Sequence, residues 1–295
     1  MTGPHYEAFT VPVEGGDLYG GMWGPPNAPV VLAAHGITGN HLHLGFVARE
    51  LSTDRRVVAP DLRGRGASAA ITGPFGMDVH ARDLVAVLDH VGAEKAVVVG
   101  HSMGGFVATT MAANHPDRVE RLVLVDGGLA LDAPKGDVDE ILDAIIGPAV
   151  QRLSMTFPSA QAYRDFWKAH PAFASDWSDV MEAAVDYDLV GTPPELRSGV
   201  SLDAVRRDSI DNLDDERVRR VAEESRCAIE LLWAERGMLD QVPGLYTEEL
   251  VAPFRTWLGD RFGDRFGDRR IDGVNHYTIG LSERGAKEIA SAARG

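Results

Sequence analysis

The sequence predicts an α/β protein with a mostly parallel central sheet and helices on both faces. Short apolar runs typical of strands buried on both faces recur along the chain, at Val30–Ala34, Arg56–Ala59, Ala96–Val99 and Leu122–Val125. Helix-like stretches lie between these runs, and strands that alternate with helices indicate parallel βαβ units. The chain has 295 residues, more than most single domains, so we expect one large domain with an insertion.

The predicted helices have the periodicity that packing on a sheet requires. The stretch His80–His90 brings apolar side chains to one face, namely Ala81, Leu84, Val85 and Leu88. The stretch Phe106–Asn114 is rich in alanine and methionine. Parallel sheets of this kind place functional residues in crevices at the carboxyl ends of their strands. We therefore expect the site residues directly after the predicted strands.

The pattern changes after the run that ends at Val125. Residues 129–226 contain no strand-like run of comparable strength and are broken by prolines, at Pro148, Pro158, Pro171, Pro193 and Pro194. We expect several short helices in this segment. The sequence therefore predicts a helical cap over residues 129–226.

Strand-like sequence returns after the predicted cap. It is found at Ile229–Trp233 and around Arg270–Val274, and an amphipathic helix is predicted over Glu283–Ala293. These boundaries predict that residues 1–128 and 227–295 form the α/β core.

One segment repeats itself. Residues 259–269 contain three successive copies of Gly-Asp-Arg, two of them followed by Phe. Three copies are too few for a solenoid, and glycine at every fourth position weakens a helix. We expect a surface loop without functional weight.

Composition excludes several classes of partner. With 29 Lys+Arg against 44 Asp+Glu, the formal net charge is -15, which opposes binding to nucleic acid and to anionic membranes. The one cysteine, Cys227, forms no internal disulfide and is interpreted as a structural thiol. No signal peptide is visible, and no stretch approaches the ~18 apolar residues of a membrane span. We expect a soluble, cytoplasmic protein.

The strongest motif is Gly100-His101-Ser102-Met103-Gly104, which lies between a predicted strand and a predicted helix. It matches G-x-S-x-G, a nucleophile elbow in which a strand turns sharply into a helix with the serine at its apex. The two glycines allow the strand and the helix to approach closely. The backbone N–H of Met103 then points from the helix N-terminus towards a developing oxyanion.

Two further motifs accompany the elbow. His35-Gly36-Ile37-Thr38-Gly39 follows the first predicted strand, and residues 61–68 read D-x-R-G-x-G-x-S. With these motifs in this order, the sequence resembles the α/β-hydrolase superfamily over nearly its whole length. The resemblance implies that Ile37 donates the second backbone N–H of an oxyanion hole beside Met103. It also implies a structural role for Asp61 and Arg63.

A serine hydroxyl needs a general base, and a histidine base needs an acid that orients it. The candidate base is His276, which follows the last predicted strand, where the resemblance places the catalytic histidine. The resemblance also implies that His101 points away from the site and that His35 is structural. The pair His41 and His43 has the spacing of metal ligands but lacks an evident third ligand. We expect no metal and no cofactor.

The acid departs from the family's commonest pattern. The resemblance places an aspartate in the turn after the strand Ile229–Trp233, where this chain has Gly237. Asp126 follows the strand Leu122–Val125 and is our first choice, with Glu235 and Asp240 as alternatives. All three preserve the order Ser…Asp/Glu…His.

The predicted cap is aromatic and acidic. It carries 20 Asp+Glu against 11 Lys+Arg, a net charge of -9 that disfavours anionic substrates. We expect some of its aromatic side chains to pack on each other and others to line a cleft above Ser102, the candidates being Phe157, Phe166, Trp167 and Trp177.

Together these features predict a serine hydrolase that cleaves a small to medium, largely apolar ester or lactone through an acyl-enzyme. A carbon–carbon bond hydrolase or a cofactor-free perhydrolase would use the same three residues. A ligand receptor with a slow triad is the alternative outside enzymology, and turnover of esters distinguishes it from the enzymes.

Overall fold

Eight strands form one sheet in the order β1-β2-β4-β3-β5-β6-β9-β10 in the computed structural model, which describes residues 5–131, 136 and 138–295. The pairs β1–β2 and β2–β4 are antiparallel, and every pair from β4 to β10 is parallel. The strands are β1 (Glu7–Val13), β2 (Gly16–Trp23), β3 (Val30–Ala34), β4 (Arg56–Pro60), β5 (Ala96–His101), β6 (Val119–Val125), β9 (Ala228–Arg236) and β10 (Phe266–Asn275). The predicted mostly parallel sheet is confirmed.

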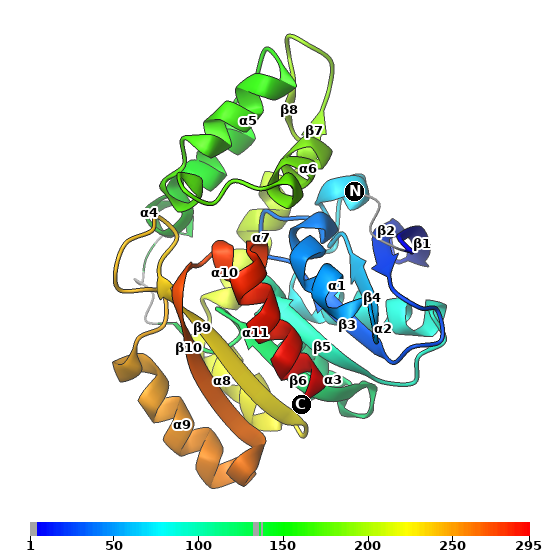
Figure 1. Cartoon of the computed structure of the whole chain (residues 1–295), viewed down its shortest axis with the longest axis vertical. Helices are drawn as coiled ribbons and strands as arrows, with labels where there is room; N and C mark the ends of the chain where they lie inside the picture. Colours follow the sequence, from blue (N-terminus) through cyan, green and yellow to red (C-terminus); the bar gives the residue numbers. More distant parts are fainter. Residues whose placement is uncertain (1–4, 132–135, 137) are drawn as a thin grey trace.

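Helices cover both faces of the sheet, as predicted (Figure 1). The first face packs against α2 (Met77–His90), α3 (Met103–Asn114), α8 (Asp215–Glu224) and α9 (Glu248–Phe262). The opposite face packs against α1 (Gly45–Leu51), α10 (Thr278–Leu281) and α11 (Glu283–Arg294). The sheet is therefore enclosed between two layers of helices.

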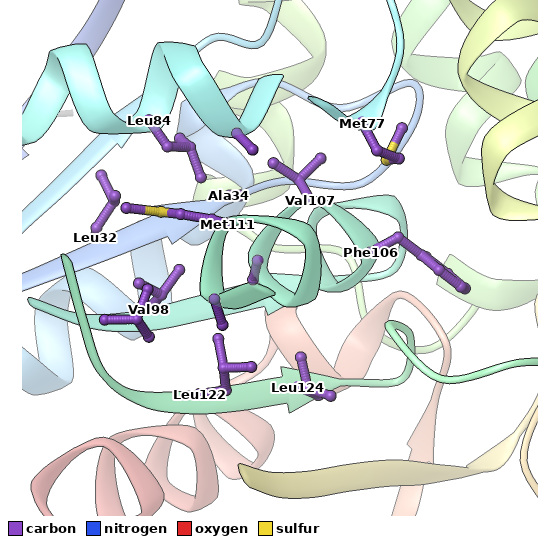
Figure 2. Close-up of a cluster of buried hydrophobic side chains, with 14 of the residues drawn as sticks. Leu32, Ala34, Met77, Leu84, Val98, Phe106, Val107, Met111, Leu122 and Leu124 are labelled. Carbon is purple, nitrogen blue, oxygen red and sulfur yellow. The ribbon is translucent and has the colours of Figure 1, made fainter. Parts of the chain in front are cut away.

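The core beneath the site is centred on α3. Figure 2 shows Val107 and Met111 of this helix between Leu84 of α2 and the strands. All three side chains are fully buried, as is Val98 of β5. Replacing a buried methionine or leucine by alanine costs about 2–5 kcal/mol, so this packing fixes the helix that follows Ser102.

The described residues between β6 and β9 form four further α-helices: α4 (Val138–Gln151), α5 (Ala160–Lys168), α6 (Asp179–Asp188) and α7 (Leu202–Asn212). A two-stranded ribbon, β7 (Leu189–Val190) with β8 (Arg197–Ser198), follows α6. Figure 1 shows α5, α6 and the ribbon at one end of the molecule, beyond the sheet. We call residues 129–226 the insertion. Its last helix, α8, packs on α3 in the layer that covers the sheet.

Asp208 of α7 attaches the insertion to the core. Its carboxylate accepts hydrogen bonds from Arg65 at 2.6 Å, from His80 Nε2 at 3.0 Å and from the backbone N–H of Gly76 at 2.8 Å. Burial alone would raise the pKa of Asp208, but His80 and Arg65 hold it well below its usual range. A buried charge with these partners is compensated, and removing one partner is costly.

The prediction of a surface loop over the glycine repeat, residues 259–269, is wrong. Gly259–Phe262 are the last residues of α9, and the strand β10 begins at Phe266. Helix packing by Leu258 and pairing of β10 with β9 override the low helix and strand propensity of glycine.

Among the described residues, no helix is both long enough and apolar enough to span a bilayer.

Candidate active site

Ser102 lies at the turn between β5 and α3. Its backbone has φ 54° and ψ -123°, in the left-handed half of the map, where a side chain is strained. The turn depends on the absence of neighbouring side chains, because a Cβ on Gly104 would collide with the carbonyl of Ala34. A Cβ on Gly127 would likewise collide with the carbonyl of Ser102. The chain therefore presents Ser102 at the end of a buried strand.

Three side chains from three different strand ends meet at this turn. Ser102 Oγ lies 3.0 Å from His276 Nε2, and His276 Nδ1 lies 2.6 Å from Asp126 Oδ2. Asp126 and His276 are 1% and 2% exposed, whereas Ser102 is half-buried. With Nδ1–H donated to Asp126, the neutral imidazole offers its Nε2 lone pair to the serine hydroxyl. This arrangement can draw a proton from Ser102.

The structure separates the three candidate acids. Only Asp126 among them is hydrogen-bonded to His276, and its Oδ1 accepts from the backbone N–H of Ala234 at 3.0 Å. The Glu235 carboxylate accepts from the backbone N–H of Gly273 instead. The Asp240 carboxylate accepts from Arg236 and from Asn275. Glu235 and Asp240 thus hold the loops around His276 without touching its imidazole.

His101 supports the loop that carries His276. Its Nε2 donates to the carbonyl of His276 at 2.7 Å, and the two rings lie 5.0 Å apart between centroids. The resemblance implied that His101 points away from the site. The ring of His101 instead contacts His276 and lines the small pocket described below. The motif Gly100–Gly104 alone does not indicate this position of the ring.

The loop after β3, residues 35–39, is held by its carbonyls. His35 Nδ1 donates to Gly36 O at 2.8 Å, Arg65 Nε donates to Ile37 O at 2.8 Å, and Arg152 donates to Thr38 O at 3.2 Å. In a trans peptide the N–H points opposite to the carbonyl. Fixing the Gly36 carbonyl therefore also fixes the direction of the Ile37 N–H.

Met103 is the first residue of α3, so its N–H has no acceptor within the helix. Ile37 and Met103 both border the larger of two pockets beside Ser102, which are described below. Two backbone N–H groups so placed are able to stabilise an oxyanion. Arg65 and Arg152, which hold the loop and are almost fully buried, were not singled out by the sequence.

The two histidines with metal-like spacing have different surroundings. His41 bonds to Asp61 at 2.8 Å and to the Tyr6 hydroxyl at 3.1 Å. His43 instead lines the small pocket beside Ser102. Among the described residues, no three or more His, Cys, Asp or Glu side chains form a cluster able to hold a metal ion.

Two pockets meet at Ser102. The small pocket spans about 360 Å³, part of it open to solvent, and is bordered by the loop after β3 and by His43, His101, Met238, His276 and Tyr277. The large pocket encloses about 550 Å³, part of it open to solvent, and its wall is mostly apolar. The insertion supplies part of that wall through Leu131, Ile141, Ser209, Asn212 and Leu213.

Three of the four aromatic residues predicted to line the cleft pack on other rings, and the fourth, Trp177, contacts Lys168. Phe157 contacts Tyr163 and Phe166 edge to face, with centroids 4.7 Å and 5.7 Å apart, and Trp167 contacts Phe173 at 5.8 Å. Trp177 lies under the ammonium group of Lys168. None of the four is among the described residues that border either pocket, so the structure places them in the packing of the insertion.

The buried histidines predict a pH-dependent stability. Burial lowers the pKa of His35 to about 3 and that of His101 to about 4. In the unfolded chain these imidazoles titrate near pH ~6.5, so below that pH the unfolded state binds protons that the folded state excludes. The contribution of these two histidines to the free energy of unfolding is fully present above pH ~6.5. It is lost as the pH falls towards the folded pKa values, by up to about 1.4 kcal/mol per pH unit for each histidine.

Urea unfolding between pH 7 and pH 5 measures this loss, in a range above the titration of most carboxylates. We expect the free energy of unfolding to fall steadily as the pH is lowered. A free energy that does not change over this range would contradict neutral, buried imidazoles.

The sequence matches proteins of one family. A family model described as the alpha/beta hydrolase fold matches residues 29–185. The lipase LipV of Mycobacterium tuberculosis is 36% identical over 177 residues, which are 60% of this chain and 64% of LipV. The esterase YbfF of Escherichia coli is 37% identical over 100 residues, which are 34% of this chain and 39% of YbfF. The chain thus matches less than two thirds of the length of these relatives.

Solved structures agree over the whole chain. An E-2-(acetamidomethylene)succinate hydrolase superposes with a TM-score of 0.81 at 20% identity, covering 99% of this chain and 100% of the other. A thioesterase domain from the curacin biosynthetic pathway superposes with a TM-score of 0.76, also at 20% identity, with 99% and 100% covered. At such identities the likeness shows a shared fold.

Proposed function

Because this chain belongs to the α/β-hydrolase family, we propose that it is a serine hydrolase that cleaves a small to medium, largely apolar carboxylic ester or lactone. The observation that supports the proposal is the series Ser102–His276–Asp126, whose contacts of 3.0 Å and 2.6 Å suit the proton transfers of acyl transfer. The relatives named lipase and esterase support the same class of reaction.

The first half-reaction forms an acyl-enzyme. Ser102 Oγ attacks the substrate carbonyl carbon while its proton passes to His276 Nε2. Asp126 stabilises the imidazolium that results. The negative charge on the former carbonyl oxygen is stabilised by the N–H groups of Ile37 and Met103. When the tetrahedral intermediate collapses, the C–O bond breaks and His276 gives its proton to the departing alkoxide.

The second half-reaction uses the same groups with water. His276 takes a proton from the water, whose oxygen attacks the acyl carbon, and a second tetrahedral intermediate forms. Its collapse breaks the bond to Ser102 Oγ, which recovers a proton from His276, and the carboxylic acid leaves. In a lactone the alcohol and the acid are parts of one product.

The insertion is proposed to act as the cap over this site. It supplies a large part of the wall of the large pocket, including Leu131, Ile141 and Leu213. An apolar wall of this kind favours an uncharged substrate with an apolar chain. The net charge of -9 in the insertion also favours an uncharged substrate, because it disfavours anionic ones.

Covalent labelling tests the proposal. A fluorophosphonate reacts with an activated serine and leaves a phosphonyl group on it, and we expect one adduct per chain, located by peptide mass spectrometry on Ser102. Hydrolysis of p-nitrophenyl esters of increasing acyl length is measured in parallel. A labelled protein without ester turnover would favour a different acyl or carbon substrate, and a protein that neither reacts nor turns over would contradict a serine hydrolase.

A further inference from the structure

Asn212, a residue of the large pocket's wall, has a side-chain oxygen without a hydrogen-bond partner among the described residues. This oxygen, Oδ1 of the last residue of α7, is buried from solvent and makes no hydrogen bond to the part of the chain that the structure describes. Burying an amide oxygen without a partner is costly, so such an atom at a pocket wall marks a place where a ligand or a water supplies the missing bond. Asn212 borders the same pocket as Ser102.

The rest of that pocket offers little to a polar ligand. Its wall outside the candidate catalytic residues is formed mainly by apolar side chains, among them Phe106, Leu131, Ile141 and Leu245. The other small polar residue there, Ser209, donates its hydroxyl to the carbonyl of Val205 at 2.7 Å. Among the described residues of this wall outside the candidate catalytic ones, Asn212 is therefore the polar residue whose side chain has an atom without a partner.

The position of His276 shows which half of an ester enters this pocket. His276 borders the small pocket, whereas Ser102 borders both. Since His276 Nε2 must give its proton to the departing oxygen, the leaving group belongs on the side of the small pocket. The acyl group then extends from Ser102 into the large pocket, past Ile37 and Met103, towards Asn212.

We propose that the acyl group of the substrate carries a hydroxyl on an otherwise apolar chain, and that the side-chain amide of Asn212 hydrogen-bonds this hydroxyl. A hydroxyl both donates and accepts, so it satisfies the Asn212 amide in either orientation of the oxygen and nitrogen. This inference rests on the proposed ester hydrolysis and adds the substrate class: esters or lactones of hydroxy-acids.

Selectivity between two matched substrates tests it. The substrates are the p-nitrophenyl ester of a straight-chain acid and a set of derivatives with the hydroxyl at successive carbons. For one position of the hydroxyl, we expect kcat/KM to exceed that of the plain ester by roughly 3- to 10-fold, the effect of one net hydrogen bond. In Asn212→Leu, which has a similar size and no polar group, the ratio should fall to about one.

Ser209→Ala is the matched control. It removes a hydroxyl that lies on the same helix and borders the same pocket, but this hydroxyl already has a hydrogen-bond partner. It should keep the wild-type ratio. If no position of the hydroxyl gives a preference, or if Asn212→Leu retains the preference, water satisfies Asn212 and the inference is wrong.

A binding measurement separates this inference from the proposed hydrolysis. The affinities of the plain acid and of the hydroxy-acids are compared by calorimetry in Ser102→Ala, with and without Asn212→Leu. A hydroxyl preference that depends on Asn212 supports the polar contact even where no ester is turned over. Ester turnover without any such preference supports the hydrolase and overturns the hydroxy-acid specificity.

Discussion

Ser102→Ala is expected to lower kcat for a p-nitrophenyl ester by on the order of 10⁵-fold or more, because Ser102 is the only described residue that hydrogen-bonds to His276 Nε2. The remaining rate would come from the oxyanion donors and from substrate binding. The measurement is the initial rate of p-nitrophenolate release, with the background rate in buffer subtracted.

The alanine variant should fold normally, since Ser102 is half-buried and its hydroxyl bonds only to His276 among the described contacts. Ser154→Ala, which removes an exposed hydroxyl, is the matched control and should keep the wild-type rate. Equal activity of the Ser102→Ala variant and the wild type would show that the elbow serine is not the nucleophile.

Asp126→Asn is expected to lower kcat by about 10⁴-fold, the effect known for triad acids. The amide oxygen of the new side chain can keep the hydrogen bond from the backbone N–H of Ala234, which Asp126 Oδ1 accepts at 3.0 Å. Its NH₂ group then faces His276 Nδ1 and donates to it. His276 must place its proton on Nε2, so it offers Ser102 a donor where the reaction needs an acceptor.

The other two carboxylates provide controls for this experiment. Glu235→Gln and Asp240→Asn remove negative charge near the same loop but no bond to the imidazole. We expect both to remain within about 10-fold of the wild-type kcat. A loss as large in Glu235→Gln as in Asp126→Asn would move the role of the acid to Glu235.

The parallel part of the sheet could be predicted because its strands are buried on both faces and read as continuous apolar runs. The antiparallel pair β1–β2 was not predicted, because β1 has no continuous apolar run and β2 contains the glycines Gly16, Gly20 and Gly21. The helix α9 was missed because Pro253 and Gly259 lie within it, and its stability comes from packing of Val251, Phe254 and Leu258 on the core.

The site was predictable to the extent that its residues follow strand ends. The choice among three carboxylates depends on sheet order, since β6 lies beside β9 and β9 beside β10. This order brings Asp126 within reach of a loop 150 residues later in the chain. Asn212 has no local motif at all, because its place in the pocket follows from how α7 docks on the core.

Arg65 carries a consequence for protein engineering. Its guanidinium donates to the Ile37 carbonyl on one side and to Asp208 of α7 on the other. Exchanging residues 129–226 for the corresponding segment of another enzyme would leave this buried cation without its carboxylate unless the graft supplies one. The segment that lines part of the large pocket is therefore not an independent module: a functional chimera must transplant a counter-ion along with the new binding surface.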